Sequence, residues 1–502
     1  MNQFKFSWAW LVTVCLNKFG PSNSTGTIHC RSTWASPVFL QRLVYPLILQ
    51  PPPLHPTASR TKRDPAPRSR QHHRNAFQSI DPRRLPFRNP PPSFRPPTPD
   101  SSAPMAAPRP WADLPTDIVL EIFRRVPCAI DRVNMATACH SWLAELADAP
   151  AAPPQLPSLL LPSADVTGVY CYLSGRRDHN KFTALTGPRH FGSYDGSWSF
   201  LAYGQTHGHR LLNIRTGESH AVPDVLEDDH DDQIHSMVIL AATLSFPPDR
   251  LNCVAAGIVT YQPDADAPRR RHFAFWRLRG EVASCNVVPD PLVGHGLELE
   301  DVVYHSDSFH FLSQGEDILE CTLFLDGDGA VLGVVADLIR FQNAGRSRSY
   351  AEFVRARYLV ASRGELLMVV RFAPNPHAPT SSFKVFRMLQ QQMPKDDKEE
   401  EDVDEYPRCW SELDTLGGRM LFVGRACSRS YEADQYPGFK DGVYFLDDGC
   451  FYDDEMMFRG VNERQYPCND IGKWSEGPPP HVDGYFPEQG PSHNSPPAWL
   501  LP

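Results

Sequence analysis

Apolar residues follow two different periods along this chain, and the change falls near residue 148. Before it they recur every three or four positions, which places them on one face of a helix. The members of this stripe are Ile118, Val119, Ile122, Phe123 and Val126. The pattern predicts a small domain of short helices over residues 108–148.

Polar residues and prolines indicate where these helices begin and end. Asp113 is placed to cap the first helix, and Pro115 falls in its first turn, where a missing N–H costs nothing. Pro127 ends that helix, Asp131 is placed to cap a second, and a third passes through Trp142. A unit of roughly 40 residues rarely buries enough surface to be stable alone. We therefore expect it to dock on another surface.

Beyond a Pro-rich linker at residues 149–157, short apolar or alternating runs are separated by turn residues. β-Branched and aromatic residues are frequent in them, for example at residues 366–372, and this is typical of strands. Radial repetition of four-stranded blades protects the sheet edges of such a large all-β region. At about 40 to 50 residues per blade, residues 158–477 are expected to form a six- or seven-bladed β-propeller. The predicted fold is mainly β with a small α module.

The 50 prolines of this 502-residue chain crowd toward its two ends. This composition predicts a disordered Pro/Arg-rich extension at residues 1–104 and a disordered tail at residues 478–502. Met105 offers an alternative translation start, which would leave the extension out. The basic block at residues 60–74 fits a solvated tail, a nuclear-import signal or a polyproline ligand. The apolar run at residues 6–16 is shorter than the roughly 20 residues that span a bilayer, so no membrane segment is expected.

The net charge of −10 argues against a general nucleic-acid binder, because phosphate binding needs clustered positive charge. Twelve cysteines lie scattered without the paired spacing of a zinc site. They favour reduced thiols, and hence the cytoplasm or the nucleus.

Three stretches contain residue types that can carry chemistry. Residues 227–235 and the acidic run at 396–405 offer metal ligands, but their spacing matches neither a tetrahedral site nor a calcium loop. Cys427 follows a predicted strand, and no histidine can be placed beside it from the sequence. We expect no metal, no cofactor and no catalytic residue. A propeller hydrolase or lyase is the enzymatic alternative.

One polar loop is rich in residue types that are enriched at protein interfaces. Its candidate target-binding residues are Arg425, Arg429, Tyr431, Tyr436 and Phe439. Propeller loops often build a recognition face. The alternative is that residues 436–439 only pack a turn.

The helical stretch resembles the F-box. The matching residues are Trp111, Asp113, Leu114, Pro115, Ile118, Val119, Ile122, Phe123, Cys139, His140, Ser141 and Trp142. Ala138 and Leu143 depart mildly from the family pattern. The resemblance implies binding to a Skp-type adaptor. The anchors it implies are Leu114, Pro115, Ile118, Ile122, Phe123, Val126 and Trp142.

A second resemblance covers residues 155–475 and concerns the KIB-type β-propeller that follows the F-box in a large plant family. It is carried by residues 301–323, 358–372, 416–448 and 470–477, in that order. Together the two resemblances imply a non-enzymatic substrate-recognition subunit of an SCF-type ubiquitin ligase, joined to cullin through the adaptor and holding an unidentified target protein. The alternative is an interaction module that sequesters a partner without promoting ubiquitination.

Overall fold

The computed structural model describes residues 114–502 apart from residues 163–166, 178–184, 186, 229–232, 262–269, 279, 281, 287–297, 327–330, 342–349, 391–407, 449–464 and 485–489. The predicted extension at residues 1–104 and the acidic run at 396–405 lie outside the described residues. Trp111, Asp113 and part of the stretch 227–235 lie outside them as well.

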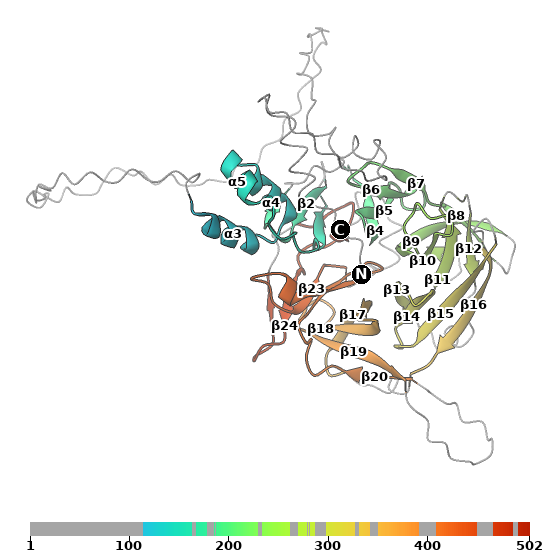
Figure 1. Cartoon of the computed structure of the whole chain (residues 1–502). Helices are drawn as coiled ribbons and strands as arrows, with labels where there is room; N and C mark the ends of the chain where they lie inside the picture. The colour runs from blue at the N-terminus through green and yellow to red at the C-terminus, as the bar shows by residue number, and fades with distance from the viewer. Residues whose placement is uncertain are drawn as a thin grey trace, which may run out of the picture. The chain divides into compact units, whose positions relative to one another are not determined.

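The described helices are all short and lie at the N-terminal side of the strands (Figure 1). They are α3 (Thr116–Arg125), α4 (Ala129–Ala136) and α5 (His140–Glu145). α3 ends before Pro127, as predicted. Asp131 was predicted to cap the second helix, which is wrong, because Cys128 is the N-cap and Asp131 lies in the first turn. An acidic side chain there still favours the positive end of the helix dipole.

The described strands form six sheets, set around one axis as the blades of a propeller (Figure 1). The sheets are numbered from the one that contains β4, and the sheet that contains β1 and β26 is counted last; the first three follow with their strands. They are β4 (Arg189–Tyr194), β5 (Trp198–Ala202), β6 (His209–Asn213) and β7 (Ser219–Ala221); then β8 (Val225–Asp228), β9 (Ile234–Leu244), β10 (Val254–Tyr261), β11 (Arg270–Arg277) and β12 (Val282–Asn286); then β13 (Leu299–His305), β14 (Ser308–Ser313), β15 (Ile318–Leu325) and β16 (Val331–Ile339). In the second of these, β8 bonds to both β9 and β12, so that sheet closes on itself.

The remaining sheets complete the ring and confirm the predicted propeller, with six blades. The fourth has β17 (Phe353–Ser362), β18 (Glu365–Ala373), β19 (Ser382–Gln390) and β20 (Arg408–Glu412); the fifth has β21 (Arg419–Val423), β22 (Arg429–Glu432), the 3₁₀ turn η3 (Ala433–Gln435), β23 (Gly442–Phe445), β24 (Gly472–Ser475) and β25 (His481–Asp483); the sixth has β1 (Ser158–Leu161), β2 (Gly168–Cys171), β3 (Arg176–Arg177) and β26 (Ala498–Leu500).

The β17–β18 hairpin shows how local sequence builds a blade. Eight of the nine residues of β18 are buried, as expected for an apolar run packed on both faces. Arg363 and Gly364 form the two-residue turn and have φ of 54° and 81°. Two successive positive φ values match the twist of paired strands, so this turn fixes the register that pairs Ser362 with Glu365.

The sixth sheet joins the two ends of the described chain. β26 pairs antiparallel with β1, placing Ser158 opposite Leu500 and Leu160 opposite Ala498. Trp499 is fully buried, lies edge-on to Phe422 at 5.1 Å between ring centroids, and donates from Nε1 to the Val423 carbonyl at 2.8 Å. The last strand of the chain thus closes the ring.

Two predictions about this end of the chain are wrong: that the propeller stops at residue 477 and that residues 478–502 are disordered. Strands β25 and β26 lie beyond residue 477, and Leu501 is buried like Trp499. The only apolar run in this stretch is very short and has prolines on both sides. Its strand conformation comes from the partner strand β1, because an isolated segment of this composition cannot offset its own loss of conformational entropy.

Trp499→Ala should lower the stability of the whole propeller by about 3–5 kcal/mol, because it empties a large buried site and removes the bond to Val423. Thermal unfolding followed by circular dichroism checks this. Leu251→Ala is the control, since Leu251 is 84% exposed and should stay within about 0.5 kcal/mol of wild type. Equal melting of Trp499→Ala and wild type would contradict closure through β26.

Candidate functional site

The helix α3 has two apolar faces with different surroundings. Val119 and Phe123 are fully buried, whereas Ile118 and Ile122 are 45% and 36% exposed. Because residues four apart lie on the same side of a helix, the two isoleucines form one patch. Pro115, at the start of the helix, is also exposed, and Leu114 is partly buried. We call these four residues the α3 patch.

The buried face of α3 belongs to the core of the helical module, here residues 114–149. The core residues are Val119, Phe123, Ala136, Leu146 and Ala149, with partly buried Leu114, Leu120, Met135, Trp142 and Leu143 around them. The module therefore has a hydrophobic core of its own, and the exposed isoleucines are not part of it.

Arg132 supports this core, although the sequence analysis did not single it out. Its side chain is 4% exposed, and its guanidinium lies 4.8 Å from the centroid of the Phe123 ring. It donates to the carbonyls of Val126, Pro150 and Arg124 at 2.5, 3.2 and 3.4 Å. These carbonyls lie at or just beyond helix ends and would otherwise lack an intrahelical hydrogen-bond partner. By donating to them, the buried guanidinium gains the hydrogen bonds that offset its loss of water.

The predicted adaptor anchors separate into three groups by exposure. Ile118, Ile122 and Pro115 are exposed, as a docking surface requires. Phe123 is fully buried, so its assignment as a surface anchor is wrong. Val126 and Trp142 are partly buried. The periodicity of the sequence placed Ile122 and Phe123 in one stripe, but it could not tell which edge of the stripe faces the other helices.

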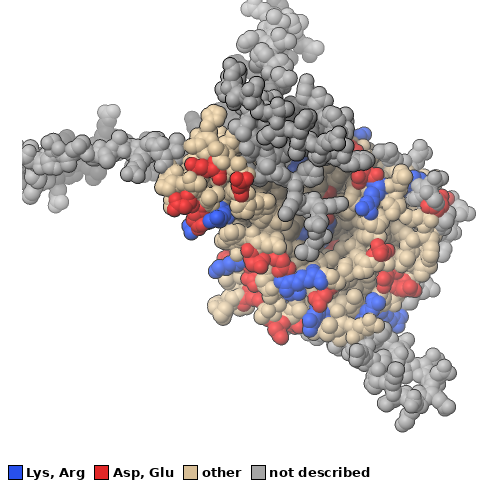
Figure 2. Space-filling model, in the orientation of Figure 1, with Lys and Arg blue, Asp and Glu red and all other residues tan. Residues whose placement is uncertain are grey.

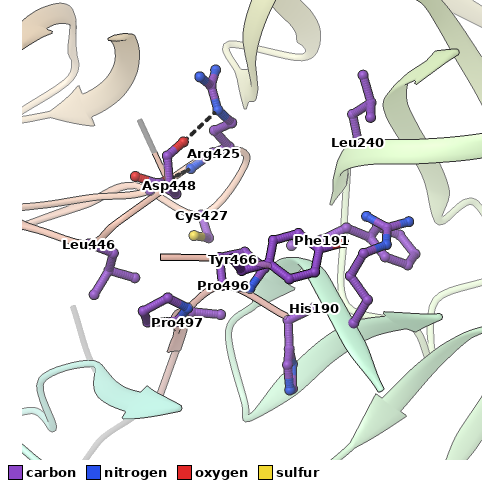
Figure 3. A pocket seen from close by; sticks show the side chains of 14 residues that line it. His190, Phe191, Leu240, Arg425, Cys427, Leu446, Asp448, Tyr466, Pro496 and Pro497 are labelled. Carbon is purple, nitrogen blue, oxygen red and sulfur yellow. Dashed lines mark hydrogen bonds between the residues drawn. The ribbon is translucent and has the colours of Figure 1, made fainter. Parts of the chain in front are cut away.

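A small cavity lies at one end of the propeller centre, between blades that are far apart in the sequence (Figure 3). Its volume is about 70 Å³, well below the roughly 300–1,000 Å³ of a typical small-molecule pocket. Its lining includes His190, Phe191, Leu240, Arg425, Cys427, Leu446, Asp448 and Tyr466. A space of this size suits water or a single inserted side chain better than a drug-sized ligand.

Arg425 and Asp448 face each other beside this cavity (Figure 3). The Arg425 backbone N–H donates to Asp448 Oδ2 at 3.1 Å, and its Nε donates to the Asp448 carbonyl at 3.1 Å. Its terminal nitrogen reaches the Glu300 carbonyl at 2.5 Å, and so links the fifth blade to the third. The guanidinium of Arg425 therefore makes its hydrogen bonds within the fold.

Arg371 is the fully buried centre of an ionic network whose carboxylates, Asp448 and Asp470, are partly buried. Its side chain is 0% exposed and donates to Asp470 Oδ2 at 2.8 Å, to the Leu446 carbonyl at 2.6 Å and to the Tyr358 hydroxyl at 3.2 Å. Tyr358 donates in turn to Asp448 at 2.8 Å. Burial lowers the pKa of Arg371, but the neighbouring Tyr358, Asp470 and Asp448 outweigh it and the pKa is raised overall. An arginine within the apolar run of β18 is the sequence signal that such a network must exist.

Asp301 joins three blades through backbone hydrogen bonds. Its carboxylate accepts from Val302, Leu359 and Ala426 at 2.8, 2.8 and 2.6 Å. Burial raises the pKa of Asp301 to about 7, and the three N–H donors act in the opposite direction. Since every donor is a main-chain group, the carboxylate works as a structural bridge.

The five residues predicted to bind a target all make contacts within the fold, and Tyr436 is the one of the five that is fully buried. Tyr436 is 1% exposed, Tyr431 lies edge-on to Phe422 at 5.6 Å, and Phe439 packs on Tyr172 at 5.2 Å. The prediction of an exposed recognition face is therefore wrong for Tyr436, and the structure favours the alternative that this loop packs a turn.

The two arginines of that set are engaged as well. Arg429 pairs with Asp195 at 2.9 Å, and Arg425 makes the bonds given above. Residue type alone suggested interface side chains, because the sequence does not reveal these distant partners.

Four further observations concern the chemistry and the surface of the described residues. Burial raises the pKa of Cys427, which keeps its sulfur a neutral thiol in the cavity wall. Within the described ranges, no three His, Cys, Asp or Glu side chains are grouped as metal ligands. None of the helices in the described part of the chain is long and apolar enough to cross a membrane. On the face shown in Figure 2, acidic and basic side chains are interspersed.

Comparison with known proteins adds one finding. A family model described as the KIB1-4 beta-propeller matches residues 172–474. A search of curated proteins finds no significant match. Among solved structures, a GH43 β-1,3-galactosidase with galactodeoxynojirimycin is similar at 9% identity and a TM-score of 0.26, over 55% of this chain and 84% of that chain. A score that low carries no argument here. The family match describes a β-propeller domain suited to protein interaction.

Arg371→Met should destabilise the propeller by about 3–5 kcal/mol, because it removes the fully buried cation that pairs with both Asp448 and Asp470. Urea unfolding with a fitted slope measures this. The matched control is Arg363→Met. Arg363 pairs with Glu432 but is 40% exposed, so its loss should cost at most about 1 kcal/mol. Equal effects of the two substitutions would refute the structural role of the network.

His190 should make stability depend on pH. Burial lowers its pKa from 6.5 to about 4, so between these values the unfolded chain binds a proton that the folded chain does not. Its contribution is fully present above about pH 6.5 and is lost as the pH falls toward 4. His190→Asn should reduce the slope of unfolding free energy against pH in that window by up to about 1.4 kcal/mol per pH unit. Unfolding measured at several pH values checks this, and an unchanged slope contradicts it.

Proposed function

This chain belongs to the KIB1-4 β-propeller family, and on that premise we propose that it is the substrate-recognition subunit of an SCF-type ubiquitin ligase. In this proposal the helical module is an F-box that docks on a Skp-type adaptor. The propeller holds a target protein. The protein acts in the cytoplasm or the nucleus.

The observation that carries the proposal is the α3 patch. Ile118 and Ile122 are exposed while Val119 and Phe123 fill the core of the same helix. Apolar side chains that a module leaves outside its own core form a natural surface for a helical partner. The patch includes the Leu114-Pro115 pair, and these residues also carry the resemblance to the F-box pattern.

The charged residues on the polar side of α3 also fit a protein interface at the α3 patch. Glu121 forms ion pairs with Arg124 and Arg125 at 3.6 and 2.8 Å, so the polar side of α3 is self-paired and solvated. The apolar patch thus has a charged border, an arrangement typical of protein interfaces, in which a polar rim surrounds an apolar centre.

The propeller serves as a rigid holder in this mechanism. Its blades are locked together by the networks of Arg371 and Asp301, so a target bound to its surface has a defined position. Through the adaptor, cullin brings a conjugating enzyme that is loaded with ubiquitin. Holding the target beside this enzyme raises the effective concentration of the reacting groups. The chain contributes position and no catalytic group of its own.

Ile118→Ala with Ile122→Ala should abolish capture of the Skp-type adaptor. Truncating two central apolar anchors typically costs more than about 2 kcal/mol, or about 30-fold in affinity. A pull-down with purified adaptor measures this, and cullin is followed in the same eluate. Circular dichroism checks that the double variant folds, as expected because both side chains lie outside the module's core.

The matched control is Asn134→Ala, an exposed change on α4 that should bind like wild type. Failure of the folded wild-type chain to capture the adaptor would refute the proposal. Capture of the adaptor without cullin would instead support a module that sequesters its partner.

A further inference from the structure

Two cysteine sulfurs face each other where the helical module meets the sixth blade. Cys128 is the N-cap of α4, and Cys171 is the last residue of β2. Their Sγ atoms lie 4.0 Å apart. Cys128 is 3% exposed, whereas Cys171 is partly exposed. Both are thiols in this structure.

The surrounding contacts hold these sulfurs in place. Cys128 belongs to the same buried cluster as Tyr172 and Leu173, and Ile130 packs against that cluster. On the polar side of the junction, Arg176 of β3 lies 3.7 Å from Asp131 of α4. The pair is therefore positioned by contacts on both of its sides rather than by a chance meeting of two loops.

We propose that Cys128 and Cys171 form a redox-sensitive dithiol, which a peroxide oxidises to a disulfide linking the helical module to the propeller. A disulfide has its sulfurs about 2.05 Å apart. From 4.0 Å, the two sulfurs must approach by about 2 Å to form this bond.

The exposures of the two cysteine residues define the order of the chemistry, because Cys171 is partly exposed and Cys128 is buried. The partly exposed Cys171 loses its thiol proton and its sulfur attacks one oxygen of the peroxide: an S–O bond forms, the O–O bond breaks, and the second oxygen leaves as hydroxide or alkoxide and takes up the proton that Cys171 lost. This makes a sulfenic acid at Cys171. The Cys128 sulfur then attacks the Cys171 sulfur; an S–S bond forms, the S–O bond breaks, and water leaves with the Cys128 proton. The peroxide is reduced by two electrons and the thiol pair is oxidised by two.

The environment of Cys128 fits the second role. Its hydrogen bond with Cys171 and its burial raise its pKa, so it is a neutral thiol that oxidant in solution does not reach. It acts once a sulfenic acid has formed beside it. A small dithiol reductant reverses the reaction by thiol exchange, as is usual for disulfides of reducing compartments, which are mostly transient.

The disulfide would close a loop containing the whole linker and β1, since its cysteines are 43 positions apart. Such a crosslink restrains the unfolded chain and should raise the resistance of the junction to unfolding. This inference is independent of which partner the helical module binds.

The test treats the full chain with hydrogen peroxide, blocks the remaining thiols, and maps disulfides by mass spectrometry without reduction. We expect a crosslinked peptide that joins Cys128 to Cys171, reversed by dithiothreitol, and a higher urea midpoint for the oxidised chain. Cys128→Ala and Cys171→Ala should each abolish the crosslink and the shift in midpoint. Cys253→Ala is the matched control, because Cys253 is buried in another cluster and should leave both unchanged.

Three results would overturn the proposal. One is a sulfinic acid at Cys171 with no crosslink in the wild-type chain. Another is a crosslink of Cys171 to a different cysteine as the main product. The third is an equal shift of the urea midpoint in wild type and Cys171→Ala, since the gain would then come from oxidation elsewhere. The wild-type mapping decides the matter even if either alanine variant fails to fold.

Discussion

The pairing of β26 with β1 is the interaction on which the ring of blades depends. A propeller is a circular array, and each blade is packed only against its neighbours, so an open ring would expose apolar faces on two blades. Here the closing sheet takes its innermost strand from residues 498–500 and its other strands from residues 158–177. Trp499 fastens this strand to the neighbouring blade through its contacts with Phe422 and Val423. One short strand thus converts a linear series of sheets into a closed domain.

Buried charge provides a second kind of connection between blades. Arg371 belongs to the fourth blade, and its partners Asp448 and Asp470 lie between strands β23 and β24 of the fifth. Asp301 of the third blade receives N–H groups from the fourth blade and from a loop of the fifth. Apolar packing between blades permits sliding, whereas a buried charge with specific partners permits one arrangement only. These networks therefore fix how the third, fourth and fifth blades sit against one another.

The sequence could predict the strands and the helices because their signals are local. The apolar run of β18 and the three- and four-residue spacing in α3 are examples. It could not predict β26, since a three-residue strand between prolines has no pattern of its own and depends on β1. It also could not separate Ile122 from Phe123. Their exposures differ because α4 and α5 pack on one edge of the stripe, and that choice is made by tertiary contacts.

The same limit explains why the five residues of the polar loop were assigned to recognition. Arginine and tyrosine are enriched both at interfaces and in buried networks, and only the partner distinguishes the two uses. For Arg429 the partner is Asp195, which is 234 positions away in the sequence. A pair with that separation leaves no trace in local spacing. The α3 patch was easier to predict because its four members lie within nine residues of one another.

The two ends of the described chain are coupled through the sixth blade. The helical module contacts that blade through Cys128 beside β2 and Asp131 beside β3. Cys128 and Trp499 also belong to one buried cluster. The strands that receive the first helices are therefore held in register by the last residues of the chain, through β1. Anything that loosens β26 weakens the seat of the helical module, even though the α3 patch and Trp499 are separated by more than three hundred residues. The linear sequence does not reveal this dependence, which arises because the ring of blades is closed.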